Sequence, residues 1–227
     1  MNVIAIGCFF VTLIIYLVTK RFYQRFPKIY FTPLLLTPII VVLSLVLSGI
    51  PYETYHAGTH WLSDMIGPAT VALAVPLYKN FAILKKHALT VGVSVLSGAV
   101  LAYLSSAWLA KELKLNTQIM ESIAPRSATT PIAMAISELT GGVPAITALF
   151  VLMTGLLGML LGPVIIRLFR IRNEIARGVL LGTSAHTAGT SKAFEFGSVS
   201  GSISSIAMIL TAFITLLIAP WALRIFQ

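Results

Sequence analysis

Charged side chains are scarce in this chain. Asp, Glu, Lys and Arg make up 10% of its 227 residues, whereas soluble domains contain about 25%. Hydrophobic residues make up 57%, and a water-facing surface of that composition would not stay dispersed. The low charge excludes an ordinary soluble enzyme and a disordered chain, and it predicts that lipid surrounds most of the surface.

Cysteine and acidic residues are also rare. The single cysteine, Cys8, excludes an intramolecular disulfide and a cysteine-ligated metal site. Seven acidic residues stand against 16 Lys and Arg, which gives a net charge of +9. The basic residues form short clusters between apolar runs, and that pattern is typical of membrane topology and not of nucleic-acid binding. We therefore expect a lipid bilayer, and no nucleic acid, as the partner of this surface.

Several apolar runs have about the 20 residues that a helix needs to cross a bilayer. Two other segments, 122–140 and 178–196, are rich in Gly, Ser, Thr and Pro and are predicted to be re-entrant or broken. The predicted fold is all-α: one integral membrane domain over 1–227, with about six full transmembrane helices and these two segments. The predicted crossings are 3–19, 30–50, 61–78, 88–110, 143–169 and 200–223.

The positions of Lys and Arg predict the orientation, because cytoplasmic loops carry an excess of them. The basic residues gather mainly at 20–28, 79–86 and 167–177. All three clusters face the cytoplasm if the N-terminus lies outside. The segment 51–60, which has no Lys or Arg, is then an outer loop.

Helix breakers suggest an internal repeat. Ile-Gly-Pro at 66–68 and Ile-Ala-Pro at 123–125 each precede a short run that ends in another proline, Pro76 or Pro131. Matches this short also arise by chance. Interrupted segments in two halves of a chain are nevertheless typical of secondary transporters, because irregular backbone survives in a bilayer only inside the protein or beside water.

Two cations and a histidine lie in the broken segments. Arg126, Lys192 and His186 would be costly at bilayer depth unless each faced a cavity or a partner. The alternatives are that Arg126 and Lys192 reach the interface and that His186 makes a structural hydrogen bond. An arginine fork and helix N-termini suit a carboxylate, so we predict a site for a small organic anion. Its further donors are Ser127, Thr129, Thr130, Thr187 and Thr190.

Carboxylates near membrane depth are candidates for proton coupling. Asp64 and Glu138 are the two that we assign to this role, and Glu195 is a third acidic residue that can pair with Arg126 or Lys192. The alternative for each is a position at the interface. We predict no metal or cofactor, because the chain has no clustered carboxylates.

Two other segments carry a structural expectation. Gly155, Gly158 and Gly162 form a small-residue face that permits close helix contact. Packing within the chain is favoured over a homo-oligomer interface. The segment 111–121, KELKLNTQIME, is predicted to be a polar connector.

Three runs of residues resemble the LrgB/CidB family of bacterial inner-membrane proteins. They are PATVALAVPLY at 68–78, APRSATTPIAMA at 124–135 and RGVLLGTSAHTAGT at 177–190. The resemblance extends over essentially the whole chain. It implies a multi-pass protein of the bacterial cell membrane that works beside a small holin-like partner of the LrgA/CidA type.

The resemblance implies two accounts of function. One is antiholin-like or holin-like control of murein hydrolases, autolysis and cytolysis. The other is transport of small carboxylates, namely pyruvate in bacteria and glycolate or glycerate through a similar plastid protein. The residues themselves favour transport, because a cation cluster on broken helices is a costly way to build a nonspecific lesion. An enzyme is not expected, since no G-x-S-x-G or H-E-x-x-H motif occurs.

Overall fold

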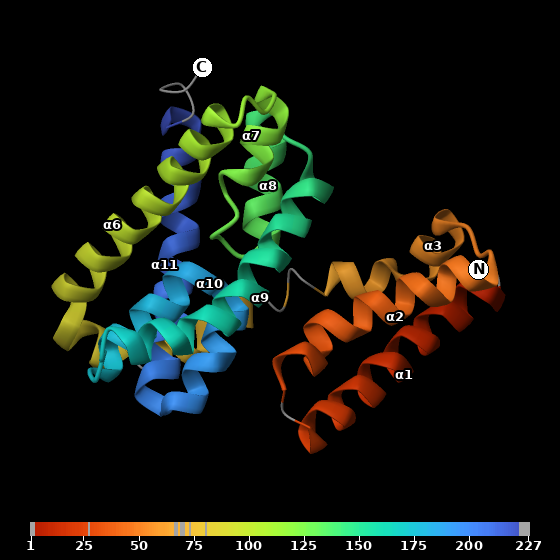
Figure 1. Cartoon of the computed structure of the whole chain (residues 1–227), viewed down its shortest axis with the longest axis horizontal. Coiled ribbons are helices and arrows are strands. Elements are labelled where there is room, and N and C mark those ends of the chain that lie inside the picture. Colours follow the sequence, from red (N-terminus) through yellow and green to blue (C-terminus); the bar gives the residue numbers. More distant parts are fainter. Residues whose placement is uncertain are drawn as a thin grey trace. The chain divides into compact units, whose positions relative to one another are not determined.

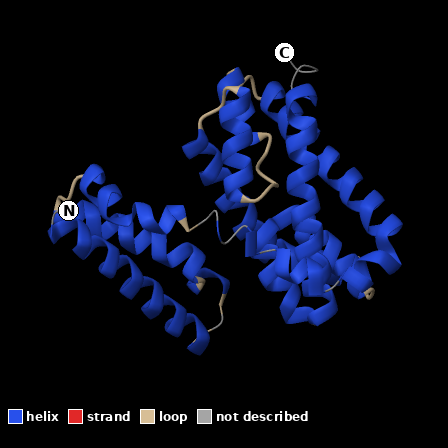
Figure 2. Ribbon diagram, turned by 180° about the vertical axis from the view of Figure 1, so that it is seen from behind, coloured by secondary structure: helices blue, strands red, loops and turns tan. Residues whose placement is uncertain are grey.

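The computed structural model describes residues 3–26, 28–65, 68, 71–72, 74–79 and 81–222, and over this part of the chain it contains helices and loops and no strand (Figure 2). The predicted all-α class is confirmed. Contacts divide the chain into two compact units, Met1–Ala69 and Thr70–Gln227, and each is described by itself below as unit 1 and unit 2.

Unit 1 is a small group of helices held by close backbone contact. A Cβ placed on Gly58 would lie 1.9 Å from the Ala5 carbonyl oxygen, so α1 and α3 touch at this glycine. The hydroxyls of Thr19 and Thr37 lie 2.8 Å apart and join α1 to α2. The elements are α1 (Val3–Arg25), the 3-10 helix η1 (Ile29–Phe31), α2 (Pro33–Ser48) and α3 (Tyr52–Asp64).

The prediction of an outer loop over 51–60 is wrong, because this segment forms most of α3. The one glycine of this segment, Gly58, lies inside the helix and is the point of contact with α1. The imidazole ring of His56 is exposed and stacks on Tyr52 at 5.7 Å.

The predicted crossing 61–78 begins in α3, and its last part forms the short helix α5 (Ala74–Lys79) of unit 2. The Ile-Gly-Pro copy of the predicted repeat includes residues 66 and 67, which lie outside the described residues.

Unit 2 contains the two broken segments. In Figure 1, α6 and α11 lie side by side, and α7 and α8 lie beside α9. Its remaining helices are α6 (Phe81–Glu112), α7 (Thr117–Ile123), α8 (Thr130–Thr140), α9 (Pro144–Leu168), α10 (Glu174–Phe196) and α11 (Ser198–Ala222).

Four described helices are long and apolar enough to cross a bilayer. They are α1, α6, α9 and α11, and they coincide with four of the six predicted crossings. The predicted crossing 30–50 forms α2, which has 16 residues. A helix of that length spans about 24 Å, against a hydrocarbon core of about 30 Å.

The core of unit 2 lies between α11 and α6. Near its start, Ile203 and Ile206 pack against Val91 and Val95 of α6. Near its end, Ala219 joins a second cluster that includes Tyr103 and Met120. Apolar burial of this kind contributes about 25 cal/mol per Å², so α6 and α11 form the frame to which the broken segments attach.

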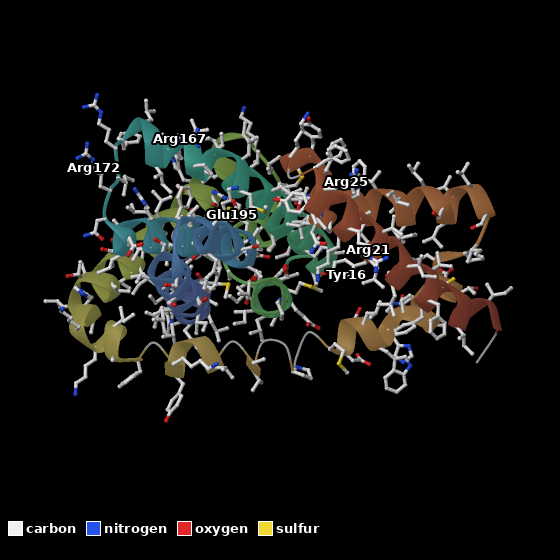
Figure 3. All side chains as sticks on the ribbon, turned by 90° about the horizontal axis from the view of Figure 1, so that it is seen from below. Tyr16, Arg21, Arg25, Arg167, Arg172 and Glu195 are labelled. Atoms are coloured by element: carbon white, nitrogen blue, oxygen red, sulfur yellow. The ribbon has the colours of Figure 1, made fainter. Side chains whose placement is uncertain are left out.

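Basic residues collect at one end of unit 2. His87 of α6 and Asn173 of the α9–α10 turn line the same cavity, which places the start of α6 beside that turn. Figure 3 shows Arg167 and Arg172 projecting outward at this end. The start of α6, which follows the basic cluster 79–86, therefore lies beside the turn that contains Arg170 and Arg172, and the orientation of this end relative to the membrane stays a prediction.

Candidate functional site

The first broken segment reverses direction between α7 and α8. The chain leaves α7, runs without helix through Thr129 and begins α8 at Thr130. The backbone N–H of Val143 donates to Ser122 Oγ at 2.7 Å, so the start and the end of the segment meet. The segment 122–140 thus enters and leaves at the same end of unit 2, as the sequence predicted.

The second broken segment is α10, which is interrupted at Ala185 and His186. His186 has φ +40°, in a region that costs a residue other than glycine about 1–3 kcal/mol. A Cβ on Gly189 would lie 2.1 Å from the Leu181 carbonyl oxygen, which no straight helix allows. The helix therefore folds back on itself as two arms, a first arm before Ala185 and a second arm after His186.

The ends of these two arms also meet. A Cβ on Gly197 would lie 2.7 Å from Glu174 Oε1, although Glu174 is the first residue of α10 and Gly197 follows its last. The Ser200 hydroxyl donates to the Glu174 carbonyl at 3.1 Å. The predicted dip and return over 178–196 matches this geometry.

Both interruptions meet the same turn of α9. Arg126 donates from Nη1 to Thr154 Oγ1 at 3.5 Å, and His186 Nε2 lies 2.9 Å from the Val151 carbonyl oxygen. A carbonyl only accepts, so His186 Nε2 carries the proton in this bond. Gly155 leaves room for the imidazole, because a Cβ there would lie 2.8 Å from His186 Cε1. The two predicted site residues therefore converge on residues 151–155, near the middle of α9.

Hydroxyl groups, and no described carboxylate, bind the side chain of Arg126. Its Nε donates to Ser106 Oγ at 2.9 Å, and the bond to Thr154 is the second contact. The ion pair between Lys192 and Glu195 does not involve this side chain. A guanidinium has five N–H donors, so this cation keeps free donors for a ligand while its own position is fixed.

The predicted hydroxyl residues divide between two places. Ser127 and Thr129 are buried beside Arg126, and within the described structure Thr129 Oγ1 has no hydrogen-bond partner. Thr130, which follows at the start of α8, is half-buried. Thr187 donates instead to the sulfur of Met208 at 3.4 Å, and Thr190 lies 2.9 Å from the Ser204 hydroxyl. The second arm thus presents its threonines to α11.

Lys192 lies on the second arm, and its side chain forms an ion pair with Glu195 one turn further on. The lysine side chain is 24% exposed and the glutamate 54%; Glu195 is labelled in Figure 3. This pair confirms that one of the predicted acidic residues binds one of the predicted cations. It does not bring Lys192 to the turn of α9 that Arg126 and His186 contact.

The two carboxylates predicted for proton coupling are on the surface, and a third is buried. Asp64 is exposed in unit 1, and Glu138 is exposed on α8. Glu121, in contrast, is 6% exposed, although it belongs to the predicted polar connector. That prediction is wrong at this residue, because the Asn116 side chain caps α7 by accepting from the Ile119 N–H and the helix turns Glu121 inward.

Glu121 sits close to the interrupted segment and to the core. A Cβ on Gly141 would lie 2.9 Å from Glu121 Oε2, and the carboxylate interacts electrostatically with Tyr103, which is 1% exposed. The capping pattern of Asn116 was the signal that could have revealed it. Among the described residues no three His, Cys, Asp or Glu side chains gather in one place.

The small-residue face of α9 packs on α10. A Cβ on Gly158 would lie 2.1 Å from Ala185 Cβ, and one on Gly162 would lie 2.5 Å from Leu181 Cδ2. The prediction that these glycines pack within the chain is confirmed. Their small size lets α9 approach the fold in α10 closely enough to hold His186.

We expect Gly158→Ala to destabilise the protein, since the added methyl forces α9 away from Ala185. Overpacking of this kind costs about 1–3 kcal/mol, and it should lower the thermal unfolding temperature in detergent. Gly92→Ala is the matched control, because nothing lies within 4 Å of a Cβ at Gly92 and alanine favours a helix. An equal effect of both substitutions would contradict the close contact at Gly158.

These observations define an all-helical membrane protein in which two folded-back segments meet one long apolar helix. The chain belongs to the LrgB-like family, whose sequence model matches residues 12–225. It is 56% identical over 220 residues to YwbG of Bacillus subtilis, with 97% of this chain and 98% of that protein covered. It is 33% identical over 215 residues to the holin-like protein CidB of Staphylococcus aureus, with 95% and 94% covered. No solved structure matches the chain.

Proposed function

We propose that this protein is a secondary transporter of small monocarboxylates such as pyruvate or glycolate. The observation that carries the proposal is the environment of Arg126. Its guanidinium is fixed by two hydroxyls at the middle of a membrane-length helix, and no described carboxylate neutralises it. A cation in that position is costly, and binding an anion offsets the cost.

A carboxylate fits this arrangement better than other anions of similar size. The planar fork of arginine binds two carboxylate oxygens at once. Ser127, Thr129 and Thr130 follow Arg126 directly and supply hydroxyl donors for a keto or hydroxyl oxygen next to the carboxylate. His186 approaches the same turn of α9 from the other broken segment. In this proposal Thr187, Thr190 and Lys192 contribute to the substrate site from the second arm, which packs against α11.

Folded-back segments suit alternating access. They are joined to the frame by short contacts at their ends, such as Val143 to Ser122 and Ser200 to Glu174. In transporters with broken helices the segments that hold the substrate move against a scaffold of full helices. We assign α6, α9 and α11 to the scaffold. We assign proton coupling to one of three carboxylates, namely Asp64 of unit 1 and Glu138 or Glu121 of unit 2.

The second candidate function is holin-like or antiholin-like control of murein hydrolases and autolysis. The name of the CidB relatives, holin-like proteins, favours it. In that case the protein acts through contact with a small membrane protein of the LrgA/CidA type, or as a homo-oligomer. The two functions are compatible if carboxylate flux controls the autolytic response.

Uptake into proteoliposomes tests the proposal. We expect radiolabelled pyruvate or glycolate to enter by a saturable route that unlabelled monocarboxylate inhibits. A simple pore gives uptake that does not saturate, and a regulator gives none, so either result contradicts transport. Thermal unfolding with monocarboxylates of two to four carbons supplies a second measurement. A ligand at about 100 times its Kd stabilises the folded state by about 2.7 kcal/mol.

A further inference from the structure

A cavity with several polar residues in its lining lies between α6, from His87 to Ala102, and the first arm of α10. Its volume is about 600 Å³, within the range of about 300–1,000 Å³ that small-molecule sites occupy. Along α6 its wall is made by His87, Thr90, Ser94, Gly98 and Ala102, which recur every three or four residues on one face. The other face of this part of α6 is apolar and exposed, as expected toward lipid.

One hydroxyl in this wall has no partner. Thr183, on the first arm, is 8% exposed and lines the cavity. Its Oγ1 is buried and, in the described structure, makes no hydrogen bond. A buried hydroxyl without a partner is unfavourable, so a ligand or water that reached Thr183 Oγ1 would relieve that cost.

Basic residues adjoin the lining residues at one end of the cavity. Lys85 and Lys86 precede His87 at the start of α6, and Arg170 and Arg172 flank Ile171 in the lining of the α9–α10 turn. The carboxylate of Glu174 in this turn lies beside Gly197, where the ends of the two arms of α10 meet. Fields of one sign around a cleft raise the local concentration of ions of the opposite sign, and here these are anions.

The inner end of the cavity leads to Arg126. Ala102 is the last α6 residue of the lining, and its carbonyl accepts from Ser106 Oγ at 2.6 Å one turn further along. The same Ser106 oxygen accepts from Arg126 Nε at 2.9 Å. Ser106 therefore follows the lining residues on the same face of α6, with Gly98 and Ala102 between it and Ser94, and this face extends from the cation-rich end to the side chain that we assign to the carboxylate.

We propose that this cavity is the water-filled vestibule through which a small carboxylate anion reaches Arg126 from the cation-rich end of unit 2. The identity of the anion rests on the proposed function, whereas the hydration of the cavity does not. His87 and Ser94 line the entrance, and Thr183 lines the inner part.

Cysteine labelling tests the vestibule. The single native thiol is removed as Cys8→Ser, and Ser94→Cys is compared with Val93→Cys, whose parent side chain is 59% exposed on the apolar face of α6. Membrane-impermeant methanethiosulfonates with a negative or a positive group are the probes. A thiolate forms readily only where water reaches it, so we expect Ser94→Cys to react about tenfold faster than Val93→Cys, or more. The negative probe should react faster than the positive one, and Arg170→Gln with Arg172→Gln should reduce that ratio.

The outcomes separate this inference from the proposed function. Equal reaction at positions 93 and 94 overturns the vestibule, even if wild-type uptake is saturable. Fast reaction at position 94 that pyruvate or glycolate slows supports it. Protection by anionic phospholipid and not by monocarboxylate would assign the cavity to a lipid headgroup and overturn the inference. Absence of saturable uptake contradicts the proposed function by itself.

Discussion

Replacing Arg126 by alanine should abolish saturable monocarboxylate uptake while the protein stays folded. Truncating one partner of a desolvated charge pair costs about 2–5 kcal/mol, which lowers affinity by about 30-fold or more. The measurement is the initial rate of uptake in proteoliposomes over a range of concentrations. Arg126→Lys keeps the charge but loses the planar fork, so it should recover only part of the activity.

Stability distinguishes a binding role for Arg126 from a structural one. The guanidinium is held by Ser106 and Thr154 and has no carboxylate partner among the described residues. Removing such a cation also removes the cost of keeping it away from water. We therefore expect the unfolding temperature of Arg126→Ala without ligand to equal or exceed that of the wild type, and the stabilisation by monocarboxylate to disappear.

Arg25→Ala is the matched control, because Arg25 is an exposed cation at the end of α1 (Figure 3). It should keep the uptake and the ligand-induced shift of the wild type. Unchanged uptake in Arg126→Ala would remove Arg126 from the site. Loss of uptake together with a much lower unfolding temperature would show that Arg126 supports the fold.

The sequence predicted the broken segments because their signals are local. Pro125, Pro131 and the small residues around His186 interrupt helices by their own geometry, and the structure interrupts the chain at these places. The pairing of Lys192 with Glu195 follows from their spacing of three on one helix face. In each case the residues that decide the structure are neighbours in the chain.

The partners of these segments could not be predicted in the same way. Ser106, Thr154 and Val151 are isolated residues in long apolar helices, and nothing in their spacing marks them as the contacts of Arg126 and His186. Their role depends on which turn of α9 faces the breaks, and that is set by close packing at glycines such as Gly158. Which side chains of two helices meet is a property of the tertiary structure, and the periodicity of one helix does not predict it.

The burial of Glu121 is the clearest example of a tertiary property that the sequence pattern did not predict. Asp64 and Glu138 were predicted as proton carriers because they lie in or beside apolar runs, yet both are exposed. Glu121 was placed in a connector, yet it is 6% exposed and interacts with Tyr103. A group that carries a proton through a transport cycle has to be shielded from bulk water in at least one state, and of these three residues Glu121 meets that condition.

Glu121→Gln should therefore uncouple the transporter from the proton gradient. The amide keeps the size and polarity of the side chain but cannot exchange a proton. A pH difference of one unit supplies about 1.36 kcal/mol, enough for about tenfold accumulation. We expect the wild type to accumulate pyruvate against its gradient when the pH differs across the membrane, and Glu121→Gln to equilibrate it only. Exchange of labelled for unlabelled pyruvate, which needs no net proton movement, should continue.

Glu138→Gln provides the matched control on α8, and Asp64→Asn provides it in unit 1. Both should accumulate pyruvate as the wild type does, because an exposed carboxyl can be replaced without changing the shielded step. Loss of accumulation in either control, with Glu121→Gln unaffected, would return the coupling role to the residue that the sequence first indicated. Loss of both accumulation and exchange in Glu121→Gln would instead mean that the carboxylate holds α7 in place beside Gly141.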